Sequence, residues 1–148
     1  MTIDEPIPSI ERQVVVPVSE DEAWAALTDP ERVAEWFTDS IAVGAVGDEY
    51  RLDFGDGSVI EGTIETVDLG RSFGFTWRWS GAPLSEVTRV TWSVEAGKGS
   101  GTTIRLIHDG WADAGLDRSA RDDHDGYWAG YLEDLAAVLR DAARGPVD

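Results

Sequence analysis

The chain has 148 residues and no cysteine, and its 12 Lys and Arg stand against 29 Asp and Glu, a formal net charge of −17. This length predicts one domain, able to bury about 70% of its unfolded surface. The acidity argues against nucleic acid and anionic membranes as partners. Without cysteine, a disulfide framework, a thiol nucleophile and a Cys-ligated metal are excluded. Seven Trp exclude a disordered acidic tail.

The N-terminal stretch predicts no targeting or membrane segment. Residues 1–9 are acidic and proline-containing, and we expect them to form a flexible lead-in to a single domain over 10–144. They contain neither a basic nor an apolar signal region, and no stretch approaches the ~18 apolar residues of a membrane span. A cytoplasmic protein is the resulting expectation.

The first elements are a strand and two short helices. Apolar residues alternate with polar ones from Ile10 to Val16, which predicts a strand. Ser19–Glu22 has the pattern of a capping box, so a helix should begin there. Asp29 followed by Pro30 is typical of a second helix start.

Residues 40–108 alternate between strands and turns, which favours an antiparallel meander. The turns are expected at Gly55–Gly57, at 69–71, at 80–85 and at Gly97–Gly101. A long helix is predicted from about Arg118 to Ala143, because apolar residues recur there at spacings of three and four. Six strands between the two short helices and the long one indicate an α+β, helix-grip fold. In that fold the long helix covers the apolar face of one antiparallel sheet.

Several segments resemble the START-like, or SRPBCC, superfamily, and within it the branch named after the activator of the heat-shock chaperone ATPase. The similar segments are Ile10–Phe37, Phe75–Trp77, Thr88–Trp92, Gly101–Leu106, His108–Trp111 and Gly126–Leu139. The resemblance implies a deep cavity between the sheet and the long helix. It also implies that the cavity binds a hydrophobic small molecule, since members of the superfamily do so, and a few catalyse cyclisation or dehydration of polyketides.

The candidate ligand-binding residues are mostly aromatic side chains on the inward face. Such rings bury large areas and, with a few polar tips, form the usual lining of a small-molecule pocket. Trp24 and Trp36 are expected instead to anchor the two short helices. The candidates are Tyr50, Phe54, Phe75, Trp77, Trp79, Trp92, His108, His124, Trp128 and Tyr131.

Polar residues near this set have two interpretations each. His108 is either a ligand donor or general base, with Tyr131 as helper, or a structural histidine. His124 either reaches the pocket mouth or belongs to a solvated helix start. A buried Arg12 would be an anchor for an acidic ligand group. Gly126 and Gly130 either bring the helix close to the sheet or leave room for a ligand.

Metal ions and cofactors are not expected. The two histidines are isolated in the sequence, so they do not suggest a zinc site. The acidic stretch before Gly126 does not match a calcium loop, because Arg121 and Leu132 occupy its first and last ligand positions.

Three functions from different classes remain open at this point. The first is a carrier of an aromatic, polyketide-like or lipid-like molecule. The second is a cyclase or dehydratase with His108 as acid and base, and the third is a chaperone-activating module that uses the acidic surface. A homodimer and a chaperone contact are open as partners.

Overall fold

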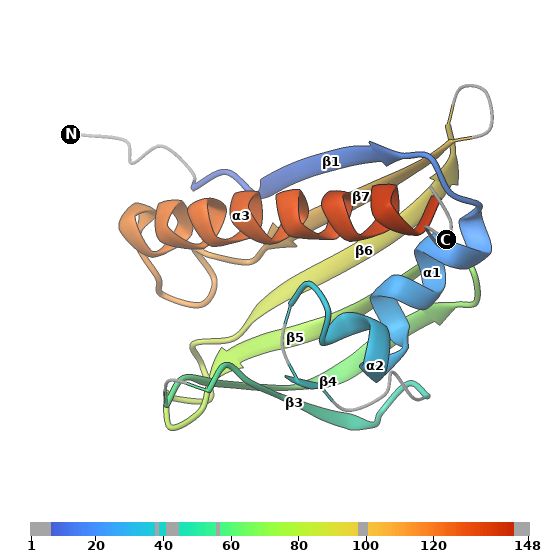
Figure 1. Ribbon diagram of the computed structural model, residues 1–148. Coiled ribbons are helices and arrows are strands. Elements are labelled where there is room, and N and C mark those ends of the chain that lie inside the picture. The colour runs from blue at the N-terminus through green and yellow to red at the C-terminus, as the bar shows by residue number, and fades with distance from the viewer. Residues whose placement is uncertain (1–6, 38, 41–44, 56, 98–100, 144–148) are drawn as a thin grey trace.

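A computed structural model describes residues 7–37, 39–40, 45–55, 57–97 and 101–143. Figure 1 shows one sheet with helices on one side. Three helices are present: α1 (Glu20–Thr28), α2 (Pro30–Val33) and α3 (Arg118–Ala143). The strands are β1 (Ile10–Val16), β2 (Asp39–Ser40), β3 (Glu49–Asp53), β4 (Val59–Asp68), β5 (Ser72–Trp79), β6 (Thr88–Ala96) and β7 (Thr102–Asp109).

The strands pair in the order β1-β7-β6-β5-β4-β3-β2, and each neighbouring pair is antiparallel. Strands β2 to β7 form a meander, in which each strand lies beside the next one in the sequence. The first strand, β1, pairs with β7 and forms one edge of the sheet. The expected succession of one strand, two short helices, six strands and a long helix is therefore confirmed. Within the turns, Gly55 and Gly57 have positive φ values of 82° and 93° as expected, and Asp56 lies outside the described residues. Residues 98–100 of the Gly97–Gly101 turn also lie outside them.

Alternation along the strands places the apolar side chains on the concave face. In β7, Ile104, Leu106 and His108 are fully buried. The neighbouring Arg105 is exposed. Because every second residue of a strand points to the same side, the apolar side chains gather on one face of the sheet. That face must pack against other elements to be shielded from water.

The long helix α3 covers one part of that face. It runs lengthwise beside β1 (Figure 1), and its own side chains Trp128, Leu135 and Leu139 are almost wholly buried. Asp117 accepts a hydrogen bond from the Ala120 amide at 2.9 Å, which satisfies one free N–H of the first turn.

The short helices cover another part of the same face. α1 packs on β6 and β7 and contacts α3, near the C-terminal end of the long helix in Figure 1. Ser19 caps α1 as expected, because its hydroxyl accepts from the Glu22 amide at 3.2 Å. The Glu22 carboxylate accepts a bond from Arg32 of α2 at 3.3 Å and so ties the two helices together.

Trp24 and Trp36 both make contacts that hold the short helices in place, and Trp36 also lines a hollow described below, where the sequence predicted an anchoring role instead. Trp24 meets Phe73 edge to face at 5.5 Å, and the Trp36 indole N–H donates to the Ala26 carbonyl at 2.8 Å.

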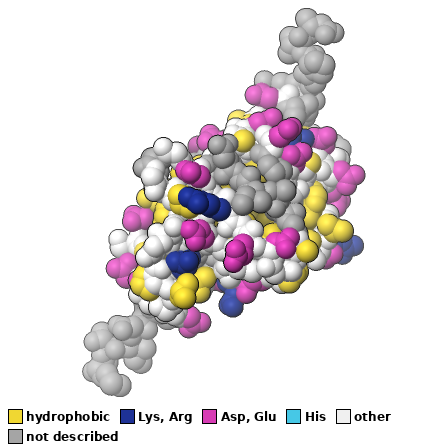
Figure 2. All heavy atoms as spheres, turned by 90° about the horizontal axis from the view of Figure 1, so that it is seen from below, with side chains coloured by type: hydrophobic (Ala, Val, Ile, Leu, Met, Phe, Trp, Pro, Cys, Tyr) yellow, Lys and Arg dark blue, Asp and Glu magenta, His cyan; other side chains and the backbone are white. Residues whose placement is uncertain are grey.

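Charges on the exterior are dispersed. On the face seen in Figure 2, acidic side chains are interspersed with single basic ones and with apolar side chains. None of the three helices of the described chain is long and apolar enough to cross a bilayer.

Candidate functional site

Two hollows lie on the concave face of the sheet. The first chamber has a volume of about 50 Å³ and is bounded by α1, the α2 region and strands β3 to β6. The second chamber has a volume of about 170 Å³ and lies beside the N-terminal half of α3. The first is lined by Leu27, Thr28, Val33, Trp36, Phe37, Tyr50, Leu52, Ile64, Phe73, Phe75 and Trp92. The second is lined by Phe54, Ser58, Trp77, Trp79, His124, Tyr127, Trp128 and Tyr131.

Phe37 forms the partition between the two chambers. It lines the first chamber, and its ring centroid lies 5.5 Å from that of Phe54 and 4.7 Å from that of Tyr131, both in the second chamber. Its ring also stacks on Trp36 at 5.2 Å. The Phe37 ring therefore lies between the two hollows, beside Trp128 at 5.6 Å.

The expected deep cavity under α3 is thus divided. Trp128, which is 1% exposed, packs against Trp77 at 5.2 Å and against Trp92 at 5.7 Å, so indole rings fill the centre of the face. The larger hollow is displaced toward the start of α3. Its rim meets solvent, because Trp79 is 37% and Tyr127 is 55% exposed.

His108 lies behind the second chamber and lines neither hollow in the described structure. The Trp128 indole N–H donates to its Nδ1 at 3.0 Å, so that nitrogen is an acceptor. Its Nε2 therefore carries the proton and donates to the Thr88 hydroxyl at 2.6 Å, and Thr88 in turn donates to the Trp77 carbonyl at 3.3 Å. Both ring nitrogens are occupied, so this geometry corrects the expectation that His108 contacts a ligand or acts as base.

His124 has a different setting, one turn before Trp128 on the wall of the second chamber. It is 6% exposed, so the solvated interpretation fails for this residue although Asp122 and Asp123 are exposed. Its Nδ1 lies 2.8 Å from the Ala120 carbonyl, and its Nε2 accepts the Trp77 indole N–H at 3.3 Å.

Both imidazoles are held in their neutral form. Burial, and secondarily the charge that His124 would carry, lowers the pKa of His108 well below its ordinary value. Burial also lowers the pKa of His124, against the opposing effects of the Ala120 carbonyl and Asp123. The two uncharged rings have their centroids 5.5 Å apart, and each ring accepts a hydrogen bond from an indole N–H.

Tyr50 is directed into the sheet rather than into the second chamber. Its hydroxyl donates to the Thr76 carbonyl, and burial raises its pKa well above the ordinary value. The ring lies over Gly62, its partner on β4, where any Cβ would come closer than 3.0 Å to Tyr50 and to the Thr76 carbonyl oxygen. The Tyr50 ring lines the first chamber, and its hydroxyl group is bonded to the sheet.

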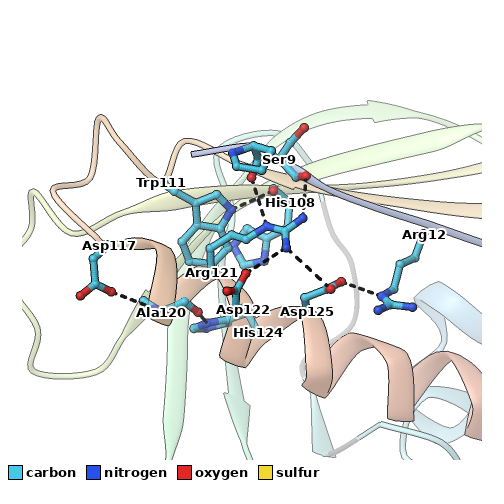
Figure 3. A network of polar contacts seen from close by, with 11 residues as sticks. Ser9, Arg12, His108, Trp111, Asp117, Ala120, Arg121, Asp122, His124 and Asp125 are labelled. Atoms are coloured by element: carbon cyan, nitrogen blue, oxygen red, sulfur yellow. Dashed lines mark hydrogen bonds and ion pairs between the residues drawn. The ribbon is translucent and has the colours of Figure 1, made fainter. Parts of the chain in front are cut away.

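Arg12 does not reach either chamber, which corrects the expectation of an anchor for an acidic ligand. It binds Asp125 of α3 at 2.7 Å, and this bond lowers the pKa of that carboxyl group. Figure 3 shows Arg121 beside this pair. Arg121 donates to the carbonyls of Pro8 and Ser9, each at 3.2 Å. Together these bonds fasten the start of α3 to β1 and the residues before it.

The glycines of α3 have neither of the expected roles. A Cβ at Gly126 or Gly130 would meet no atom within 4 Å, and both residues are exposed. They therefore face away from the sheet and from the chambers.

The structure divides the ten predicted residues into three places. Six line the second chamber, three line the first, and His108 lies outside both. The second-chamber group is Phe54, Trp77, Trp79, His124, Trp128 and Tyr131, and the first-chamber group is Tyr50, Phe75 and Trp92.

Sequence reasoning missed Phe37, Ser58 and Tyr127. Tyr127 could have been found from its spacing, since it lies three residues after His124 and four before Tyr131 on the helix. Phe37 gave no comparable signal, because its contacts with Phe54 and Tyr131 depend on the path of the chain after α2. The described residues include no group of three or more His, Cys, Asp or Glu placed to hold a metal ion.

The fold and the covered sheet face define a helix-grip, START-like protein. The sequence profile of the family described as Activator of Hsp90 ATPase homolog 1-like protein matches residues 17–140. The chain therefore belongs to this family, within the superfamily that the sequence resembles.

Solved structures agree with this assignment. DynU16, a protein of the dynemicin biosynthetic locus, is 29% identical with a TM-score of 0.80 over 90% of this chain. The chain spans 48% of DynU16. CalU16 from Micromonospora echinospora is 23% identical with a TM-score of 0.73, over 88% of this chain and 75% of CalU16. The Aha1 dimer from Colwellia psychrerythraea is 20% identical with a TM-score of 0.76, over 90% and 96% of the two chains. The last two likenesses show the fold alone.

A local likeness to a curated protein adds nothing to the assignment. Over 81 residues, 51% of this chain, the sequence is 38% identical to human Kin of IRRE-like protein 2. The chain spans 11% of that protein.

Proposed function

We propose that this protein binds a hydrophobic, ring-containing small molecule in the second chamber. The observation that carries the proposal is the composition of the wall, in which six of the eight lining side chains are the rings of Phe, Tyr or Trp. Pockets for small ligands are typically lined by apolar and aromatic groups with a few polar atoms. Trp79 and Tyr127 are 37% and 55% exposed at the rim of this one hollow, so a bound apolar molecule would remove their surface from water.

The size of the chamber limits the ligand. A volume of about 170 Å³ is below the range of roughly 300–1,000 Å³ that is usual for drug-sized ligands. One or two fused rings would fit inside, and a longer molecule would extend past Trp79 and Tyr127 into solvent.

The relationship to DynU16 supports a ligand from small-molecule biosynthesis. DynU16 belongs to a biosynthetic locus and is the more similar in sequence of the structures compared above. We therefore favour an aromatic intermediate or product, of polyketide-like character, as the ligand class. Carriage or sequestration fits the site better than catalysis, because His108 has no free ring nitrogen.

Native mass spectrometry of the freshly purified protein should reveal a bound aromatic molecule. Naphthalene-type compounds should raise the Tm in proportion to the logarithm of their concentration. Ser58→Trp, which places an indole in the chamber wall, should abolish that rise. Ser85→Trp, the same change on an exposed turn, should preserve it.

Two results would contradict the proposal. One is a Tm that does not respond to any ring compound. The other is a Tm rise that persists unchanged in Ser58→Trp, because binding would then occur elsewhere.

A further inference from the structure

One side chain of the second chamber, His124, has a ring nitrogen that can accept a hydrogen bond but cannot donate one. The His124 Nδ1 lies 2.8 Å from the Ala120 carbonyl oxygen, and a carbonyl can only accept, so Nδ1 carries the ring proton. The neutral ring then has a bare lone pair on Nε2. The Trp77 indole N–H points at this lone pair, which agrees with the assignment.

The bond that occupies this lone pair is a weak one. The Trp77 Nε1 to His124 Nε2 distance is 3.3 Å, beyond the 2.7–3.2 Å of most N–H hydrogen bonds. By contrast, His108 Nδ1 accepts the Trp128 N–H at 3.0 Å in a site with no solvent exposure. His124 is therefore the imidazole whose acceptor a ligand can take over.

The other polar side chains of the chamber differ in kind. Ser58, Tyr127 and Tyr131 contribute hydroxyl groups, which both donate and accept. Trp79 can only donate. Among the lining side chains that the structure describes, His124 is the one with an acceptor atom, Nε2, that cannot also donate.

We infer that the ligand carries a hydroxyl group on an aromatic ring and donates it to His124 Nε2. A hydroxyl suits this place because its oxygen can at the same time accept the Trp77 N–H. The two rings, whose nitrogens lie 3.3 Å apart, have to move apart to admit it, and their weak direct bond is then replaced by two bonds to the ligand. A methyl ether can accept from Trp77 but leaves Nε2 facing a methyl group. The inference rests on the proposed binding function and specifies its ligand as phenolic.

The test compares 2-naphthol with 2-methoxynaphthalene, in which a methyl group replaces the hydroxyl hydrogen and so removes the donor; the His124 variants separate the effect of the donor from that of the added methyl group. Isothermal titration calorimetry on the wild-type protein should show the methyl ether binding about tenfold more weakly, as expected for one lost hydrogen bond. In His124→Phe, which keeps a ring and removes the acceptor, the two affinities should become equal. His124→Gln, which restores a polar group near the Nε2 position, should recover part of the preference.

A second measurement covers the case in which the variants fail to fold. In two-bond ¹H–¹⁵N NMR spectra of the wild-type protein, His124 should be the Nδ1–H tautomer, and its Nε2 signal should shift upfield with 2-naphthol but not with the ether.

The outcomes separate the two proposals. Equal affinities of the wild-type protein for both compounds, or the opposite tautomer, would overturn the phenolic ligand and leave the binding function standing. Binding of neither compound would overturn the binding function and the inference together.

Discussion

The first and second chambers lie on one face of one sheet with Phe37 between them, yet they differ in access and in chemistry. In the first chamber, the O–H or N–H groups of Thr28, Trp36 and Tyr50 donate hydrogen bonds to backbone carbonyls rather than facing the hollow unpaired. In the second, His124 lines the hollow and its acceptor nitrogen holds only the long bond to Trp77, while Trp79 and Tyr127 are exposed to solvent at the rim.

This difference favours the second chamber over the first as the place of the proposed binding site. The first chamber holds about 50 Å³, little more than the roughly 30 Å³ that one water molecule occupies in the liquid. Its walls satisfy their own polar groups, so a polar guest would gain little there. The second chamber is larger and keeps a weakly bonded acceptor, so a guest gains both burial and a hydrogen bond.

The strongest disruption should come from Gly62→Ala, beneath the Tyr50 ring that lines the first chamber. The new Cβ would collide with the Tyr50 ring and the Thr76 carbonyl, and the strands cannot move apart without losing their pairing. We expect the free energy of unfolding to fall by about 3 kcal/mol, measured by urea denaturation. Gly126→Ala, where the Cβ meets no atom, is the matched control. Equal unfolding midpoints for the two variants would contradict the close packing of the Tyr50 ring and the Thr76 carbonyl around Gly62.

Removing the partition tests whether the chambers are otherwise continuous. Phe37→Ala should cost about 2 kcal/mol, since the ring is only partly buried. It should also improve the binding of three-ring over two-ring compounds, measured by native mass spectrometry. Phe73→Ala enlarges the first chamber without opening the wall, so it should not change that ratio. A ratio unchanged in Phe37→Ala would mean that Phe37 does not separate the hollows.

The structural role of His108 predicts a loss of stability without a loss of binding. His108→Phe leaves the buried Trp128 N–H without an acceptor, which should lower the free energy of unfolding by about 2 kcal/mol. The preference for 2-naphthol over its ether should survive, because that preference depends on His124. Loss of the preference in a folded His108→Phe protein would show that the two histidines act as one site.

Acid should destabilise the protein through both histidines. Their pKa values are lowered in the folded state, so between pH 6.5 and the folded values the unfolded chain binds more protons. Stability is therefore complete above about pH 6.5 and declines below it, by at most about 1.4 kcal/mol per pH unit for each histidine. Urea midpoints from pH 8 to pH 5 should show this decline, and His108→Phe should make it shallower. A flat profile in the wild-type protein would contradict the neutral, buried histidines.

The smallest effect on stability is expected from a substitution on the solvent-exposed side of α3, which faces away from the sheet. Gly130→Ala should raise the free energy of unfolding by about 1 kcal/mol, because the exposed helix position gains alanine's propensity and the Cβ meets nothing. Calorimetry should show a higher Tm with the affinity for 2-naphthol unchanged. A weaker affinity would place this face of the helix in contact with the ligand.

The elements of the fold could be predicted because their signals are local. The alternation of Ile104, Leu106 and His108, the cap at Ser19 and the spacing within Arg118–Ala143 are all encoded in a few consecutive residues. The inward set of aromatic residues followed from the same periodicity. Periodicity gives the face of a strand or helix, and nine of the ten candidates on that face line one of the two hollows. That any of them binds a ligand stays a prediction.

The division of that face required the tertiary structure. His124 meets Trp77 across 47 positions of sequence, and Phe37, in the turn that follows α2, meets Tyr131 of α3. No local pattern records such distances, since they depend on how the elements cross. Sequence by itself therefore determined the strands, the helices and their buried faces, because hydrogen bonding and amphipathic spacing act between near neighbours. Tertiary structure alone decided that indoles fill the centre, that one phenylalanine splits the space and that one histidine faces it, because packing is settled between side chains from distant segments.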